Sequence, residues 1–186
     1  MLAYCEIQLV TKPGITAPVL SSKIINVLHP LFASNPGIYG LLFPKAKEGT
    51  YPTTGDTIKV FAKTEQDATF VQKLLQMKDT RNYIITDVSN VPTFAKPAIA
   101  CFKFRIPKAP TNKEDKYYYE QLQKRLECRN HAATLPYLEL FSSSTGSNQK
   151  RPFRQYFYQK EVDASTGMAN SFGFSTYKNV LALPNL

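Results

Sequence analysis

The sequence predicts an α+β fold without an internal repeat. Apolar and polar residues alternate from Tyr4 to Val10, as in a strand with one buried face. Apolar residues recur at helical spacing after Pro18 and again between Glu65 and Met77. The chain has 186 residues, of which 43% are hydrophobic and 20% charged. This length and composition suit a packed core, in one domain or in two small ones.

Six elements are predicted in the first half of the chain. A strand at 4–10 ends in the turn 11–14, and Pro18 suits the first turn of the helix that follows. Pro30 lacks the N–H that would bond to the carbonyl of Asn26, so this helix is expected to kink or stop there. The predicted elements are strand 4–10, helix 18–34, strand 38–44, strand 57–62, helix 65–77 and strand 83–88.

This order of elements, β-α-β-β-α-β, is typical of the ferredoxin-like fold. We therefore predict a ferredoxin-like (RRM-like) domain at residues 1–92. The stretch 91–97 contains two prolines and is predicted to be a linker. Because the fold hosts many functions, it does not indicate which of them this chain performs.

Residues 98–186 are predicted to form a second, irregular α/β domain with a basic helix. The expected elements are strand 98–106, loop 107–112, helix 113–129, strand 136–141, a polar loop at 142–152, strand 153–160, loop 163–170 and a strand or turn at 172–180.

The net charge of +9 is the first indication of function. It is concentrated in residues 96–160, which carry 13 basic and 5 acidic residues, a local net charge of +8. A basic block inside a globular chain attracts polyanions, of which nucleic acid is the commonest. The alternative is a basic surface that serves solubility only.

The predicted helix 113–129 has two distinct faces. Tyr118, Leu122 and Leu126 share one face, which we expect to pack against the rest of the protein. Lys124 lies on the opposite face. That face would contact phosphates if the protein binds nucleic acid, and would otherwise be an ordinary solvated surface.

Two further segments combine aromatic and basic residues. In the strand 98–106, Phe102 and Phe104 alternate with basic neighbours and so point away from them. One interpretation places these aromatics in the core and the basic residues in water. Phe153 follows the polar loop, where it could stack on an unpaired base or pack in the core.

Several classes of protein and site are not indicated. No run of 18 apolar residues exists, and no signal peptide is visible, so we expect a cytoplasmic protein. The three cysteines are widely spaced, which suits a reducing compartment and predicts neither disulfides nor a CxxC metal site. With only two histidines, a metal centre is not expected. Phosphate-binding glycine loops and HExxH are absent from the sequence.

His29 is the candidate general base. It lies near the end of the first predicted helix and is followed by Pro30. A lone histidine on an apolar helix is usually structural, but an unperturbed imidazole also titrates near neutral pH and can move protons. The local sequence leaves both interpretations open.

Motifs at both ends of the chain point to a family. Near the C-terminus, three motifs follow in order: LPYLELFSSSTG, FRQYF and GFSTYKNV. The N-terminal third contributes AYCEIQLV, SSKIINVLHPLF, YGLLFP and GDTIKVFA. In these segments, a little over half of its length, the chain resembles the CRISPR-associated repeat endoribonucleases of type I-F systems, which cut precursor CRISPR RNA. Residues 63–134 match only in pattern.

The resemblance implies three catalytic residues and no metal or other cofactor. His29 would take or steer the proton of a ribose 2′-OH that attacks the scissile phosphate. Ser142 would hold the 2′-OH and ribose in line, and Tyr177 would orient the imidazole. The implied products are a 2′,3′-cyclic phosphate and a 5′-OH.

The resemblance also implies how an RNA hairpin is held. The basic helix 113–129 would enter the deep groove of the stem, Lys103 and Arg105 would read bases next to the cut, and Phe153 would stack on a base. The helix here is poorer in arginine than in the family, Lys-x-Arg replaces the usual Arg-x-Gln, and residues 147–152 lengthen the loop. The residues predicted to bind RNA are Lys103, Arg105, Lys113, Lys116, Lys124, Arg125, Arg129, Ser144, Thr145, Lys150, Arg151, Phe153 and Arg154.

By the same resemblance, the protein would remain on the CRISPR RNA hairpin as a subunit of the type I-F crRNA-guided surveillance complex. Since the sequence has no long apolar run, no membrane partner is expected. Two alternatives stay open. The chain could be a non-catalytic RNA-hairpin-binding module with a structural His29. It could also be a ribonuclease that uses both His29 and His131.

Overall fold

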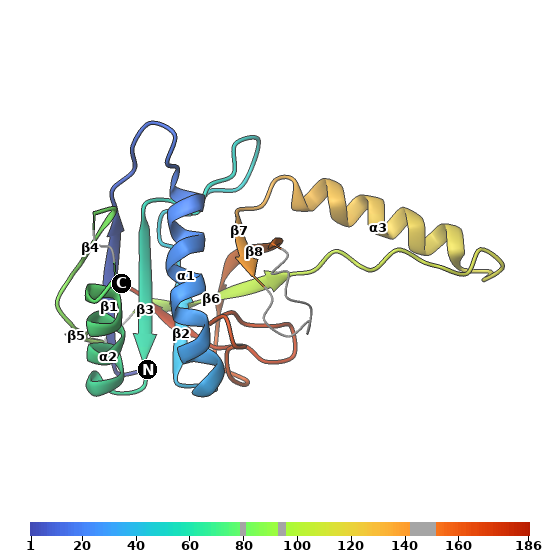
Figure 1. Ribbon diagram of the computed structural model, residues 1–186. Helices are drawn as coiled ribbons and strands as arrows, with labels where there is room; N and C mark the ends of the chain where they lie inside the picture. The colour runs from blue at the N-terminus through green and yellow to red at the C-terminus, as the bar shows by residue number, and fades with distance from the viewer. Residues whose placement is uncertain (79–80, 93–95, 142–151) are drawn as a thin grey trace.

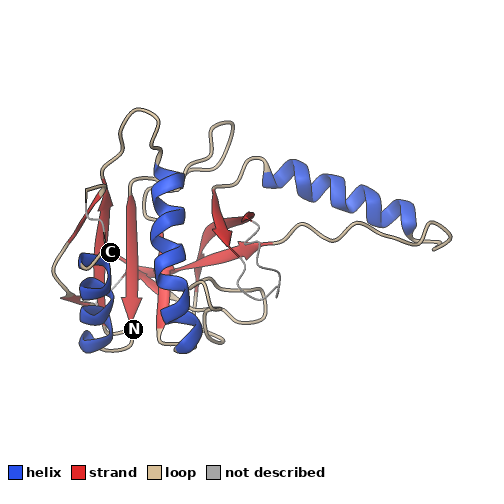
Figure 2. Cartoon of the chain, viewed as in Figure 1, coloured by secondary structure: helices blue, strands red, loops and turns tan. Residues whose placement is uncertain are grey.

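The computed structural model describes residues 1–78, 81–92, 96–141 and 152–186. Within these residues the chain forms two antiparallel sheets and three helices, so it belongs to the α+β class predicted from the sequence (Figures 1 and 2). The same described part contains no helix with the length and apolarity needed to cross a membrane.

The first sheet is built by the N-terminal half in the predicted order of elements. The bounds are β1 Ala3–Leu9, α1 Ala17–Ser34, β2 Tyr39–Leu42, β3 Thr57–Ala62, α2 Glu65–Gln76 and β4 Tyr83–Ile85. The strand order is β2-β3-β1-β4, all neighbours are antiparallel, and the short β5 (Ser89–Asn90) also pairs with β1. Both helices lie in front of this sheet in Figure 1, and alternate residues of β1 are buried.

Helix α1 begins at Ala17, one residue before Pro18, and does not stop at Pro30. It continues through Pro30 to Ser34. Leu28 and Phe32, on either side of the proline, are both buried in the core. Burial of these two large side chains stabilises the last turn although one backbone N–H is missing. Of the two expected effects of Pro30, a kink or a stop, the stop does not occur, and the exposed Pro30 ring lies on the outer surface of the helix.

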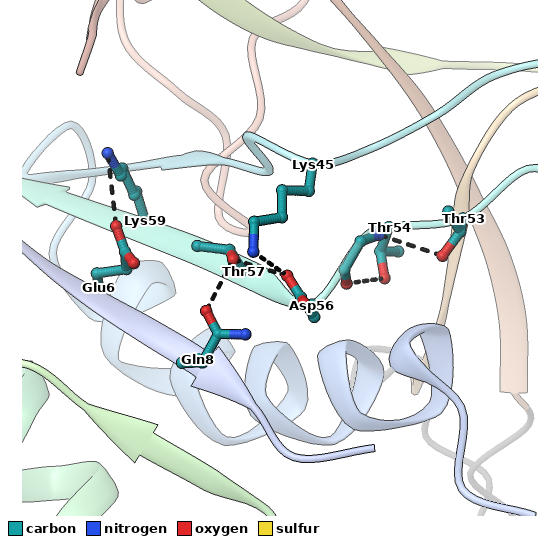
Figure 3. A network of polar contacts seen from close by, with 9 residues as sticks. Glu6, Gln8, Lys45, Thr53, Thr54, Asp56, Thr57 and Lys59 are labelled. Carbon is teal, nitrogen blue, oxygen red and sulfur yellow. Dashed lines mark hydrogen bonds and ion pairs between the residues drawn. The ribbon is translucent and has the colours of Figure 1, made fainter. Parts of the chain in front are cut away.

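A polar network joins the strands of the first sheet (Figure 3). Lys45 pairs with Asp56 at 2.9 Å, and this hydrogen bond lowers the pKa of the carboxyl. Thr57 on β3 donates to the side chain of Gln8 on β1 at 3.0 Å. Lys59 donates to the carbonyl of the last residue at 2.7 Å. The Thr57–Gln8 bond joins adjacent strands, the Lys45–Asp56 pair closes the segment between β2 and β3, and the Lys59 bond holds Leu186 against β3. Because these polar groups are paired with one another, we assign the network to stability.

The second sheet is built by the C-terminal half. Its strands are β6 Lys96–Phe104, β7 Tyr137–Phe141, β8 Pro152–Val162 and β9 Leu183–Asn185, in the order β7-β8-β6-β9. No element was predicted at β9, which pairs with β6. The predicted strand or turn at 172–180 is irregular, with an isolated bridge between Ser175 and Phe102.

One hydrophobic core extends across both sheets. Phe43, just after β2, contacts Phe157 of β8 with ring centroids 4.6 Å apart, and both side chains are fully buried. Gln159 of β8 adds two hydrogen bonds, accepting from the Phe43 N–H at 2.8 Å and donating to its carbonyl at 2.9 Å. The second sheet is thus joined to the edge of the first by packing and by hydrogen bonds between the Gln159 side chain and the Phe43 backbone.

Helix α3 (Tyr118–Ala132) differs from the predicted helix 113–129. It begins later because Asp115 forms a turn before it, accepting from the Tyr117 N–H at 2.9 Å. Lys113 and Lys116 consequently lie in the preceding turns and not on the helix.

The expectation that α3 packs by an apolar face is also wrong. The helix projects from the body (Figure 1), and Leu126 remains 44% exposed. A thin stripe that includes Leu122 and Arg125 is half-buried, and the Arg125 guanidinium donates to the carbonyl of Pro107 in the extended segment beside the helix. Three apolar residues among many charged ones do not bury enough surface to hold the helix on the sheet.

Candidate active site

His29 is held in one orientation by two contacts from the C-terminal segment. Its Nδ1 lies 2.7 Å from the carbonyl oxygen of Ser171. The ring of Phe172 stacks on the imidazole, with centroids 3.7 Å apart and an interplanar angle of 8°. A carbonyl oxygen only accepts, so Nδ1 carries the proton, and in the neutral ring Nε2 has the free lone pair. This is the tautomer that a general base needs.

A turn after residue 169 presents these two contacts. The side-chain oxygen of Asn170 accepts from the backbone N–H of Phe172 at 2.8 Å and of Phe174 at 3.2 Å. The Asn170 N–H donates to the Phe174 carbonyl at 2.8 Å. An asparagine that bonds the backbone ahead of it is a common way to close a turn. The position of Phe172 is therefore set by backbone hydrogen bonds.

Gly173 allows this turn to approach the first sheet. Its φ is +81°, and a Cβ there would lie 2.7 Å from Leu41 and 3.1 Å from Phe32. The Leu41 N–H also donates to the Gly173 carbonyl at 3.2 Å. Only glycine combines this backbone conformation with so close a contact.

A second set of hydrogen bonds joins α1 to β7 one turn before His29. The amide nitrogen of Asn26 donates to the Glu139 carbonyl at 3.0 Å, and its oxygen accepts from the Phe141 N–H at 3.1 Å. Ser22 accepts from the Glu139 N–H at 2.8 Å. Asn26 and His29 are three residues apart, so they are neighbours on the helix surface. The end of β7 is thereby fixed beside the histidine.

Five predicted site residues lie outside the described residues. Ser142 follows Phe141 directly in the chain. The others, all in the same predicted loop, are Ser144, Thr145, Lys150 and Arg151.

Phe153 contacts the same aromatic group as His29. Its ring meets that of Phe172 edge-on, with centroids 6.2 Å apart and an angle of 79°. It is half-buried against the core, so part of its surface is accessible to a ligand. The structure thus places Phe153, which is predicted to stack on an RNA base, and His29, the candidate general base, in contact with the same residue, Phe172.

Lys103 and Arg105 lie at the adjacent end of β6. Together with Phe153 and Arg154 they line a cavity of about 260 Å³. Burial, and then the charge of Arg105, lowers the pKa of Lys103. Arg154 lies over the Tyr137 ring at 4.6 Å and 3.7 Å from the Glu139 carboxylate.

The simplest expectation for β6 and Arg105, which follows it, holds in part: Phe102 is buried and Arg105 is exposed, whereas Lys103 and Phe104 are both half-buried. Cys101, which shares a face with Lys103, belongs to the core, and Lys103 is paired in register with the buried Phe157. Phe102 and Phe104 lie on the other face, where Phe102 stacks on Tyr158 at 5.3 Å. The face that bears Cys101 and Lys103 meets the core, and on the opposite face Phe102 is buried beside Tyr158, so both faces of this strand are covered.

The remaining predicted RNA-binding residues lie on the projecting arm formed by α3 and the segment before it. Lys124 and Arg129 are exposed on α3, whereas Arg125 is half-buried and bonded to Pro107. Lys113 and Lys116 are exposed in the turns at the far end.

The structure does not bring Tyr177 to His29. Its side chain is 83% exposed, and its ring contact is with Lys178, at 5.7 Å. Among the described residues, the imidazole is contacted by Ser171 and Phe172 instead. Sequence reasoning missed these two residues, although the turn pattern Asn170-x-x-Gly173 was a signal for an ordered loop.

These features define the class of protein: a basic α+β protein with a positioned histidine beside a basic and aromatic surface. A family model described as CRISPR-associated protein (Cas_Csy4) matches residues 4–185, so the chain belongs to that family. This confirms the resemblance to the type I-F repeat endoribonucleases and assigns the protein to CRISPR RNA processing. No curated protein matches the chain.

Proposed function

We propose that this protein is a metal-independent endoribonuclease that cuts precursor CRISPR RNA at the repeat hairpin. The proposed reaction is attack of a ribose 2′-OH on the adjacent phosphorus, giving a 2′,3′-cyclic phosphate and a 5′-OH. The observation that carries it is the imidazole of His29, whose Nδ1 donates to the Ser171 carbonyl and whose Nε2 has a free lone pair. The family supports the RNA substrate.

In this mechanism Nε2 of His29 takes the proton of the 2′-OH as its oxygen bonds to phosphorus. The bond from phosphorus to the 5′ oxygen breaks, and that oxygen takes a proton from the imidazolium or from water. General base catalysis of this kind contributes typically about 10²–10⁴-fold to rate. Ser142 would align the 2′-OH for attack, which is catalysis by positioning. The resemblance gives Tyr177 the role of orienting the imidazole, but we assign it no step here, because its side chain is 83% exposed and the described contact of the imidazole is with Phe172.

The hairpin would lie across the cavity at the end of β6. Phe153, half-buried beside Phe172, would stack on the base next to the cut, and Lys103 and Arg105 would read bases or hold phosphates. The exposed Lys124 and Arg129 of α3 would follow the stem. We further propose that residues 1–92 and 98–186 act as two domains, and that the product hairpin stays bound within the surveillance complex.

The experiment is a cleavage assay in EDTA with RNA that carries a type I-F repeat hairpin. A matched RNA has a 2′-deoxy sugar just upstream of the expected cut. We expect cleavage of the first RNA only, and loss of cleavage but not of binding in His29→Ala. His131→Ala is the control, because the two-histidine mechanism would require that residue. If both RNAs bind and neither is cut, the chain is a non-catalytic hairpin-binding module.

A further inference from the structure

We propose that Phe172 is a positioning residue for catalysis: its ring holds the imidazole of His29 in the plane from which Nε2 meets the 2′-OH. This inference rests on the proposed function of His29. Phe172 takes the role that the resemblance assigns to Tyr177, because Phe172 is in direct contact with the imidazole and Tyr177 is 83% exposed.

The two contacts on His29 restrain different motions. The hydrogen bond from Nδ1 to Ser171 prevents the ring from turning over, since a flipped ring would lose its acceptor. The stack at 3.7 Å and 8° prevents the ring from tilting and covers one of its faces. Each contact alone leaves one motion free, and together they leave Nε2 pointing in a single direction.

The support behind Phe172 is rigid. Its backbone N–H is bonded to the side chain of Asn170, and the following glycine is packed against Leu41 and Phe32 of the first half. Helix α1, which carries His29, also carries Phe32. The histidine and the ring that positions it are therefore fixed to the same part of the core.

Phe172 also lies between the general base, His29, and Phe153, the residue proposed to stack on an RNA base. It stacks on His29 with its face, and the contact with Phe153 is edge-on. A base stacked on Phe153 would thus be placed relative to the imidazole through a single intervening side chain. We expect the identity of residue 172 to affect the rate of cleavage more than the affinity for RNA.

The test compares Phe172→Leu, which keeps an apolar side chain but removes the flat ring, with Phe172→Tyr, which keeps the ring. Phe70→Leu is the matched control, since Phe70 is an exposed phenylalanine on α2. The readouts are the single-turnover rate at saturating RNA and the Kd for the uncleavable 2′-deoxy RNA. Because a small misplacement of a catalytic group can cost about 10²-fold in rate, we expect Phe172→Leu to cleave about 10- to 100-fold more slowly. Its Kd should stay within about threefold of the parent's, and Phe172→Tyr should restore most of the rate.

The imidazole itself provides a second readout. The chain has only two histidines, so the ring nitrogens of His29 can be assigned by NMR with the help of His131→Ala. We expect the parent to show a protonated Nδ1 and an unprotonated Nε2 at a pH where the ring is neutral. In Phe172→Leu the two tautomers should mix, because a ring that is free to tilt moves Nδ1 away from the Ser171 carbonyl and weakens that hydrogen bond.

Asn170 gives an independent variant if Phe172→Leu fails to fold. Asn170→Ala removes the acceptor that holds the turn, whereas Asn170→Asp keeps an acceptor oxygen. The first should lose cleavage and the second should keep most of it. The inference is overturned if Phe172→Leu and Asn170→Ala both cleave within twofold of the parent while His29→Ala is inactive. If His29→Ala still cleaves, the proposed function itself is wrong.

Discussion

Asn26 joins α1, the helix that carries the proposed general base His29, to strand β7. Its side chain makes three hydrogen bonds: to the Ser22 carbonyl at 2.8 Å, to the Glu139 carbonyl at 3.0 Å and from the Phe141 N–H at 3.1 Å. We predict that Asn26→Ala lowers both stability and cleavage. The end of β7 would no longer be fixed beside His29, and Ser142 follows that end directly in the chain.

The expected loss of stability can be worked from these contacts. Each such hydrogen bond contributes about 0.5–1.5 kcal/mol net, and the two groups on β7 stay partly accessible to water, which favours the lower end. Three bonds then contribute about 1.5–3 kcal/mol, from which the better helix propensity of alanine subtracts about 0.5 kcal/mol. For a chain of this size the remainder corresponds to a fall in Tm of roughly 2–10 °C.

The assay is thermal unfolding together with single-turnover cleavage below the transition. Asn35→Ala is the matched control, because Asn35 caps the same helix with one hydrogen bond from its side chain, to the Leu31 carbonyl, away from β7. We expect Asn26→Ala to cleave about tenfold or more slowly, as misplaced catalytic groups do. The reasoning is refuted if both variants have the same Tm and both cleave at the parent rate.

Three further predictions follow from exposure and burial. Tyr177→Phe should keep the single-turnover rate within about threefold, as for an exposed group that contributes less than one kcal/mol; a larger loss would show that this hydroxyl reaches the site with RNA. Burial raises the pKa of the Cys5 thiol to about 12 and that of Cys101 well above its usual range, so in the native protein only the half-buried Cys128 should react with a thiol reagent, and all three should react after unfolding. Burial lowers the pKa of Lys103, so its charge is lost at a lower pH than that of an ordinary lysine. Hairpin affinity should therefore weaken on titration into the alkaline range and should weaken less in Lys103→Arg, whose guanidinium stays charged; equal pH dependence would contradict a role of this charge in binding.

The elements of the first half could be predicted closely because local signals agree there. β3 was predicted at its observed bounds, 57–62, and α2 within one residue of its end. Apolar periodicity, turn residues and the cap at Thr64 all act within a few residues of chain. The strand β9 could not be predicted, because it is a three-residue strand formed by pairing with β6.

The helix α3 shows the limit of periodicity. Its apolar residues do recur at helical spacing in the sequence. Whether the helix packs depends on how much apolar surface it can bury against neighbouring segments, and helical spacing alone does not show this. Here an extended segment covers part of the stripe, and the helix projects from the body. Two of the lysines assigned to it lie before its first turn.

The site was predicted in part. Residues far apart in the chain, His29 and Phe153, were named from the sequence, and the structure places both in contact with Phe172. Asn26 and Phe172 were not found, since a hydrogen bond or a ring stack between distant segments leaves no periodic signal. Tyr177 was assigned to the imidazole by resemblance, and no contact between them exists among the described residues.

The sequence by itself determined the α+β class, the order of the first six elements, the basic character of the second half and the family. These properties follow from local periodicity, from composition and from motifs, all of which are read along the chain. The tertiary structure decided which groups hold His29 and which tautomer its ring adopts. Those depend on contacts between segments more than a hundred residues apart, whose geometry is set by packing of the whole core.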